Sequence, residues 1–146
     1  FEKITLVLAI QNIEAPHKVF KECARILKPG GQLYIVLNHP AFRVLKESSW
    51  GFDEQTKTQY RRIDRYMSES KVEVDMNPSR PGTVMTLSFH RPLQYYFKTL
   101  ANAGFSVGRL EEWLSHRESG EGPRKDAEDR ARMEIPLFLF LHASKL

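Results

Sequence analysis

Two apolar runs, with a helical pattern between them, begin the chain. Ile4 to Ile10 is nearly continuous in apolar and β-branched residues, which is typical of a parallel strand covered by helices on both faces. Pro16 suits the first turn of a helix, and an apolar stripe follows at helical spacing: Val19, Phe20, Cys23, Ile26 and Leu27. Leu33 to Leu37 is a second apolar run of strand length. Together the three segments predict a βαβ unit with parallel strands.

The junction between this helix and the second strand has strong turn chemistry. The tetrapeptide Lys28-Pro-Gly-Gly31 combines a lysine, which favours the carbonyl end of a helix, with a proline that cannot continue it and glycines that tolerate positive φ. We therefore expect the helix to end here and the second strand to follow directly.

The middle of the chain, from residue 41 to 91, has a different pattern. Apolar and polar residues alternate over 71–76 and again over 83–90, as in half-exposed strands, and a turn at 78–82 separates the two. A structureless loop of this length is improbable in a compact domain. We expect an antiparallel β flap of two or three strands over the end of the main sheet.

The last third returns to α/β patterning. Pro92 opens a helix whose inward face is formed by Leu93, Tyr96, Phe97 and Leu100. Strands are expected over 105–113 and 137–142, with a short polar helix over 124–133 between them. Because no full-length crossover helix is predicted between these two strands, antiparallel pairing is favoured. The fold class is α/β.

Length and composition narrow the functional classes. The chain has 146 residues, which fits one domain, and its net charge is +4 with scattered basic residues, so nucleic-acid binding is not expected. The apolar runs are too short for a membrane helix, and the single cysteine, Cys23, cannot form an intrachain disulfide. We expect a cytoplasmic protein without a membrane segment.

Three stretches, in this order, resemble class I S-adenosylmethionine-dependent methyltransferases of the small-molecule kind called type 11. FEKITLVLAIQNIEAPHKVFKECARILKPGGQLYIVLNHP resembles the family's fourth strand, following helix and fifth strand, with ILKPGGQLYI as the most legible mark. FHRPLQYYFKTLANAGFSVGRLEEW is similar to the next helix and the sixth strand, and IPLFLFLHASKL to the antiparallel seventh. The resemblance implies a partial Rossmann-like sheet of strands four to seven. It covers the chain apart from the insert, for which the family has no fixed pattern.

The resemblance also implies what the chain lacks. This family holds its cofactor, S-adenosylmethionine, mainly with a glycine-rich turn after the first strand and polar residues after the next two. The sequence contains none of these, because Gly30 and Gly31 precede a strand rather than follow one. We interpret 1–146 as the carboxyl-terminal portion of one methyltransferase domain. Whether the amino-terminal half was deleted, cleaved off or not observed stays open. Alone it is expected to bind cofactor poorly or not at all and to be inactive.

Candidate site residues follow the two parallel strands, because ligands of open α/β sheets bind beyond the carboxyl ends of the strands. The resemblance implies that Ala9, Ile10 and Gln11 lie under the transferable methyl group, and that Gln11 or Asn12 orients the acceptor. Asn38 follows the second strand and is a candidate for acceptor binding. Both asparagines are also explained as turn residues.

Two histidines are candidates for chemistry. His39 is the candidate catalytic base, since a neutral imidazole accepts a proton near pH 7 and the residue follows a strand end. The commoner alternative is a structural histidine, hydrogen-bonded to backbone before Pro40. His90 has the same two interpretations and is a candidate for acceptor binding. No metal site is expected, because the spacing of Glu111, Glu112, His116 and Glu118 matches no metal signature.

The insert contributes further candidates. Trp50 and Tyr60 are expected as walls of an acceptor pocket, and Arg62, with Arg61 and Arg65, as a grip on an anionic group. Aromatics packed on the domain and solvated arginines explain the same residues equally well. The acceptor is expected to be a small molecule.

A rival interpretation is a non-catalytic module. The strand at 4–10 would lie at the edge of a four-stranded sheet, and a long apolar edge favours pairing into a dimer or another homo-oligomer, or with a partner. A second rival, a nucleic-acid-binding protein, rests only on the basic net charge.

Overall fold

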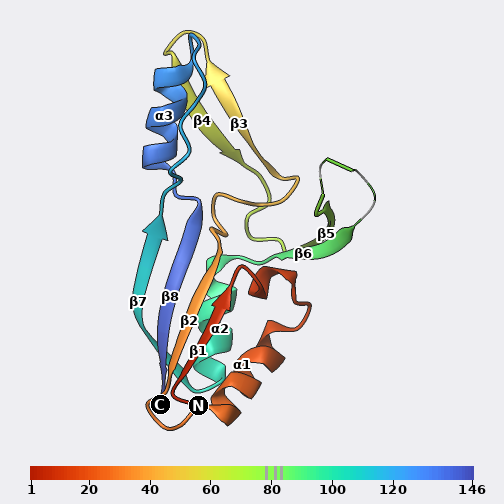
Figure 1. Ribbon diagram of the computed structural model, residues 1–146, viewed down its shortest axis with the longest axis vertical. Helices are drawn as coiled ribbons and strands as arrows, with labels where there is room; N and C mark the ends of the chain where they lie inside the picture. The colour runs from red at the N-terminus through yellow and green to blue at the C-terminus, as the bar shows by residue number, and fades with distance from the viewer. Residues whose placement is uncertain (78, 81, 83) are drawn as a thin grey trace.

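The main sheet has four strands in the order β1-β2-β8-β7 (Figure 1). The computed structural model describes residues 1–77, 79–80, 82 and 84–146. The strands are β1 (Lys3–Val7), β2 (Gln32–Asn38), β7 (Phe105–Trp113) and β8 (Phe138–Lys145). β1 and β2 are parallel, whereas β8 is antiparallel to both β2 and β7. The predicted parallel unit and the antiparallel final pair are confirmed, and β1 lies at the edge of the sheet as expected.

Two helices cover one face of this sheet. They are α1 (Pro16–Ile26) and α2 (Leu93–Asn102), and both begin where the prolines predict. Alternate residues of the two central strands point at them and are buried: Leu33, Ile35, Leu37, Leu139, Leu141 and Ala143. Phe20 of α1 and Leu100 of α2 are fully buried against these strands. The helical stripes predicted from spacing therefore form the core.

The first strand differs from the expectation in two respects. It ends at Val7 rather than Ile10, because Leu8 has φ of +50°, a left-handed conformation that breaks the extended backbone. A short 3₁₀ helix, η1 (Ile10–Asn12), follows. The strand is also not covered on both faces: Val7 is 61% exposed, because α1 and α2 lie on the opposite face. The continuous apolar run predicted burial on both faces, but one face of β1 is exposed.

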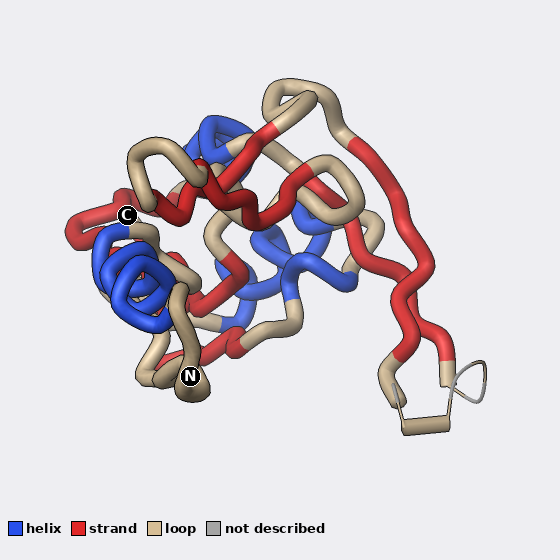
Figure 2. Tube along the Cα trace, turned by 90° about the horizontal axis from the view of Figure 1, so that it is seen from above, coloured by secondary structure: helices blue, strands red, loops and turns tan. Residues whose placement is uncertain are grey.

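The insert forms two antiparallel hairpins. The first is β3 (Ser48–Asp53) with β4 (Thr58–Ile63), and the second is β5 (Ser70–Asp75) with β6 (Met85–His90). The predicted antiparallel pairing is present, but the prediction of two or three strands was wrong, because the insert has four strands in two separate sheets. Pro78 and Pro81 of the predicted turn, and Thr83 at the start of a predicted strand, lie outside the described residues. Figure 2 shows that β5 and β6 extend away from the rest of the chain.

The last helix, α3 (Lys125–Glu134), lies beside the first hairpin, next to β4 (Figure 1). No helix in the described parts of the chain is long and apolar enough to cross a membrane.

Candidate functional site

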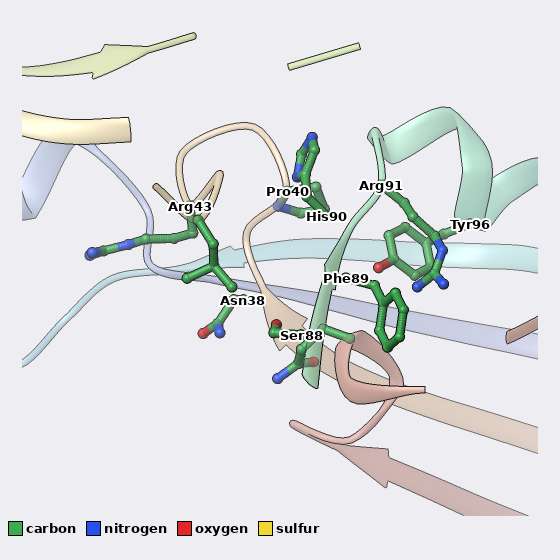
Figure 3. Close-up of a pocket in the computed structure, with 10 residues that line it drawn as sticks. Asn38, Pro40, Arg43, Ser88, Phe89, His90, Arg91 and Tyr96 are labelled. Carbon is green, nitrogen blue, oxygen red and sulfur yellow. The ribbon is translucent and has the colours of Figure 1, made fainter. Parts of the chain in front are cut away.

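A small polar cavity lies at the carboxyl ends of the two parallel strands (Figure 3). Its volume is about 20 Å³, and its lining comes from η1, the end of β2, the strand β6 and α2. The lining residues are Gln11, Asn38, Pro40, Arg43, Leu45, Ser88, Phe89, His90, Arg91 and Tyr96. Although β6 is distant in sequence from the parallel strands, it packs on η1 and so closes the cavity from the side of the insert.

Gln11, in the η1 helix that follows β1, lines the cavity. Its side-chain Nε2 donates to the carbonyl oxygen of Leu8 at 3.0 Å, across the residue whose positive φ ends β1. Its Oε1 is buried without a hydrogen-bond partner among the described residues. Buried amide oxygens are normally satisfied, so this atom is available to a ligand donor.

The imidazole ring of His90 is oriented by a hydrogen bond to the backbone of Tyr66. The His90 Nε2 lies 2.7 Å from the carbonyl oxygen of Tyr66, and a carbonyl only accepts, so Nε2 carries the proton of the neutral ring. Nδ1 is then the basic nitrogen. The Tyr66 hydroxyl accepts from the backbone N–H of Leu93, which fixes the first turn of α2 beside the cavity. His90 is therefore an oriented imidazole with one basic nitrogen.

Arg91 is the first residue after β6 and is buried. Its Nη2 donates to the carbonyl oxygen of Glu14 at 2.8 Å, and its guanidinium lies over the rings of Phe89 and Tyr95 at 4.9 and 5.2 Å. Burial raises the pKa of the neighbouring Tyr96 to about 12, although the positive charge of Arg91 acts in the opposite direction. Tyr96 therefore stays a neutral phenol next to a cation at physiological pH.

Arg43 and Arg61 form a second basic region around Trp50, and of the two only Arg43 lines the cavity. Both guanidinium groups lie over the ring of Trp50, at 5.9 and 5.1 Å. Burial lowers the pKa of Arg43, and burial together with the charge of Arg43 lowers the pKa of Arg61. Figure 3 shows the Arg43 side chain reaching away from Arg91 and from the rest of the lining, so its guanidinium belongs to the region around Trp50.

His39 is adjacent to the cavity lining but does not belong to it. Its exposed fraction is 2%, its Nε2 lies 2.7 Å from Glu112 Oε1, and its Nδ1 accepts from the backbone N–H of Ala41 at 3.2 Å. Both ring nitrogens are therefore engaged. This arrangement ties the end of β2 to β7 and holds the neighbouring Asn38 and Pro40 in the lining.

The comparisons with known proteins agree with this fold. Residues 1–35 match a family described as a methyltransferase domain. An S-adenosylmethionine-dependent methyltransferase from Mesorhizobium loti superposes with a TM-score of 0.73 at 23% identity, over 99% of this chain and 62% of that one. No curated protein matches the chain by sequence. The fold is that of the S-adenosylmethionine-dependent methyltransferases.

Other structures with the methyltransferase fold cover the whole chain. A putative S-adenosylmethionine-dependent methyltransferase from Listeria monocytogenes aligns with a TM-score of 0.72 at 22% identity, over 100% of this chain and 62% of that one. The glycopeptide N-methyltransferase MtfA, in complex with S-adenosylmethionine, aligns with a TM-score of 0.54 at 16% identity, over 100% and 54%. The chain thus spans less than two thirds of these structures. The fold that the resemblance implied is confirmed.

Within the methyltransferase fold, the predicted site residues fall into three groups. Gln11, Asn38 and His90 lie together in the cavity lining. Ala9 and Ile10 precede Gln11, and Ile10 is fully buried in the core, backbone included. Asn12 is exposed. The roles predicted for these residues stay predictions.

The residues predicted from the first hairpin lie elsewhere. Trp50 lines a separate cavity of about 240 Å³ with Gln59 and residues of α3. Tyr60 is half exposed and packs across Gly51, where a side chain would collide with its ring. Arg62 forms an exposed ion pair with Asp64 at 3.0 Å. The structure does not bring these three side chains into the lining of the small cavity.

Sequence reasoning missed Ser88, Arg91 and Tyr96 as site residues. One signal was present: Arg91 lies between a strand of alternating pattern and the proline that opens α2, within the aromatic-rich segment Phe89 to Phe97. An arginine at a junction of two packed elements is buried by the elements around it, and a buried cation requires a reason.

Proposed function

We propose that the chain forms the acceptor side of an S-adenosylmethionine-dependent methyltransferase and takes part in methyl transfer to a small-molecule acceptor. The observation that carries this proposal is the polar cavity at the carboxyl ends of β1 and β2, where open α/β sheets bind ligands. The second hairpin contributes the other wall, which fits the proposed role of the insert as a flap. The strands β1, β2, β7 and β8 then correspond to strands four, five, six and seven of the family.

The residues at the end of β1 fit one edge of the cofactor. S-adenosylmethionine supplies an electrophilic methyl group on a sulfonium centre when it is bound. Gln11, with an unpartnered buried Oε1, and the backbone of Ala9 would hold this edge, and Ile10 would support them from the core. Because the sequence has no glycine-rich turn that opens a helix after a strand, we propose that this chain alone binds the cofactor weakly and is inactive.

His90 is the residue we propose as proton acceptor when the acceptor group carries a proton. Its Nδ1 is the basic nitrogen of an imidazole that Tyr66 orients, and the residue lines the cavity. The prediction for His39 remains open, but to act as a base this residue must first release the N–H of Ala41 or the carboxylate of Glu112. Asn38 and Ser88 would position the acceptor from the two sides of the cavity.

A ¹H–¹⁵N NMR titration with S-adenosylhomocysteine tests this function. We expect saturable shift changes at ligand concentrations on the order of millimolar, confined to residues 8–12 and 38–39. Gln11→Ala should weaken the response, whereas Gln59→Ala, an amide residue on β4, should not. Absence of shift changes at residues 8–12, or equal loss in both variants, would contradict the proposal.

A second candidate function is association through the edge of the sheet. A groove of about 540 Å³ runs between β1 and α1, and it is lined by Phe1, Lys3, Ile4, Lys18, Val19, Glu22, Cys23 and Ile26. Open apolar edges favour pairing with another chain, so we propose a homo-oligomer as the alternative. Sedimentation equilibrium decides it, because a monomer that persists at high protein concentration removes this candidate. The single free cysteine, Cys23, is consistent with the cytoplasmic location that we propose.

A further inference from the structure

Two arginines lie against one tryptophan near the start of the insert. Trp50 of β3 and Arg61 of β4 are opposite each other in the ladder of the first hairpin, so their side chains project from the same face. The guanidinium of Arg61 lies over the Trp50 ring, 5.1 Å from its centroid. The guanidinium of Arg43, from the loop after β2, lies over the same ring at 5.9 Å. Two like charges are therefore held at one aromatic side chain.

Arg61 has a fixed orientation in this cluster. Its Nε donates to the carbonyl oxygen of Phe42 and its Nη2 to Ser48 Oγ, both at 2.9 Å. The Ser48 hydroxyl donates in turn to the carbonyl oxygen of Val44 at 2.7 Å. Arg61 Nη1 has no hydrogen-bond partner among the described residues, and solvent reaches this atom. Arg61 is thus an oriented guanidinium with one free, accessible donor group.

The guanidinium of Arg43 has no polar partner in the part of the chain that the structure describes. Its contact is the one with the Trp50 ring, and solvent reaches its nitrogen atoms. Figure 3 shows the side chain reaching away from the rest of the small cavity, which the same residue lines. Arg43 therefore joins the Trp50 cluster to the candidate site.

The charges of these two arginines are not neutralised by a carboxylate. Burial lowers the pKa of Arg43, and burial together with the charge of Arg43 lowers the pKa of Arg61, with no opposing effect from a carboxylate. Glu128 of α3 lines a cavity with Trp50, but within the described residues it forms no ion pair with either arginine. Neighbouring like charges that are half-buried repel each other, and a bound anion would relieve this repulsion.

We propose that Arg43 and Arg61 together bind an oxyanion group of the methyl acceptor, a carboxylate or a phosphate, beside the Trp50 ring. The assignment of that group to the acceptor rests on the proposed function. Guanidinium groups donate to the oxygen atoms of both kinds of anion, and Arg61 is already oriented to do so. Because Arg43 also lines the small cavity, an acceptor anchored at its guanidinium would extend toward Asn38 and Ser88.

An NMR titration of this chain with small probes tests the proposal. Inorganic phosphate, acetate and the neutral acetamide are each added at constant ionic strength to ¹⁵N-labelled protein without any S-adenosyl compound. The indole N–H of Trp50 reports binding, and that of Trp113, on β7, is an internal control. Trp113→Phe assigns the two signals, since the chain has two tryptophans. We expect a saturable shift of the Trp50 signal with at least one anion and no shift with acetamide, while the Trp113 signal stays in place.

Matched variants test whether the two arginines hold the anion. Arg43→Gln removes a guanidinium that has no polar partner among the described residues, so it should fold and should weaken anion binding at least about fivefold. Arg61→Gln should weaken binding at least as much, but it also loses the bonds to Phe42 and Ser48. If it does not fold, as judged by circular dichroism, Arg43→Gln decides. Arg109→Gln, which removes an exposed arginine of β7 and the same charge, should bind the anions as the natural chain does.

The three probes also distinguish the kinds of anion. Saturation with acetate alone would support the proposal and assign the group as a carboxylate, and saturation with phosphate alone would assign it as a phosphate. Absence of a Trp50 shift with both anions, an equal response to acetamide, or equal weakening by Arg43→Gln and Arg109→Gln would overturn the proposal. Failure of S-adenosylhomocysteine to bind would leave a positive anion result intact, so the two proposals fail separately.

Discussion

The contact between His39 and Glu112 should hold the end of β2 in place, and Glu112→Ala removes it. The Nε2–H of His39 would then lose its acceptor in an environment where the ring is almost wholly buried. Asn38 and Pro40, on either side of His39, line the small cavity. Increased mobility of His39 should therefore also disturb the candidate site.

The expected loss of stability follows from the His39 Nε2–H that Glu112→Ala leaves unpaired. An unsatisfied buried donor costs about 1–3 kcal/mol, and hydrogen bonds to charged groups lie in the upper part of that range. The Glu112 side chain is 52% exposed, so water replaces part of the lost interaction. We therefore expect a loss of about 1–2 kcal/mol in the free energy of unfolding. For a chain of this size this corresponds to a fall in Tm of roughly 3–6 °C.

Thermal and urea denaturation of matched variants provides the assay. Glu111→Ala is the control, because Glu111 is the preceding residue on β7, contacts Trp113 and Arg109, and has no hydrogen bond to His39. Glu112→Gln keeps an acceptor for the Nε2–H without the charge. Its fall in Tm should therefore lie between those of Glu112→Ala and Glu111→Ala. Equal Tm values for Glu112→Ala and Glu111→Ala would refute the idea that this pair stabilises the end of β2.

Three further predictions concern the core and its titratable groups. Tyr96 ionises near pH 10 when unfolded and near pH 12 when folded, so the natural chain should lose up to about 3 kcal/mol of stability between these pH values, and Tyr96→Phe should lack this loss when urea midpoints are compared. Burial raises the pKa of the Cys23 thiol, so alkylation by iodoacetamide at pH 8 should be at least about tenfold slower in the native chain than in urea, and equal rates would contradict the burial. Leu141→Ala should cost about 2–5 kcal/mol because the residue is fully buried in β8, whereas Met133→Ala on the exposed side of α3 should stay within about 0.5 kcal/mol.

The elements with strong local signals were predictable from the sequence. Pro16 and Pro92 mark the first turns of α1 and α2, and β7 has the bounds 105–113 that its pattern predicts. The polar helix α3 begins one residue later than expected and ends one residue later. In these cases local preference and tertiary packing agree.

The departures from prediction have tertiary causes. The end of β1 depends on the left-handed backbone of Leu8, a non-glycine residue for which sequence patterns predict no break. The exposure of Val7 depends on which face the helices cover, and the apolar run itself carries no such information. β8 continues to Lys145, three residues beyond the predicted end, because Ala143 and Ser144 pair with β2 and β7.

The candidate site was only half predictable for a similar reason. Gln11 and Asn38 follow the parallel strands, so the position of ligand sites in α/β sheets identifies them. Ser88 and Arg91 reach the cavity only because the second hairpin packs on η1, a contact between segments about 80 residues apart. Trp50, Tyr60 and Arg62 were chosen for residue type, and their place on the first hairpin separates them from this cavity.

Photolabelling with S-adenosylmethionine carrying a tritiated methyl group tests the central claim most directly. Irradiated protein would be digested with trypsin, which releases residues 4–18 as one peptide that contains η1 and Gln11. The account predicts that the label is concentrated in this peptide, that excess S-adenosylhomocysteine removes it, and that Gln11→Ala reduces it. Label spread evenly over the peptides, or label that S-adenosylhomocysteine does not remove, would contradict a cofactor edge at the end of β1.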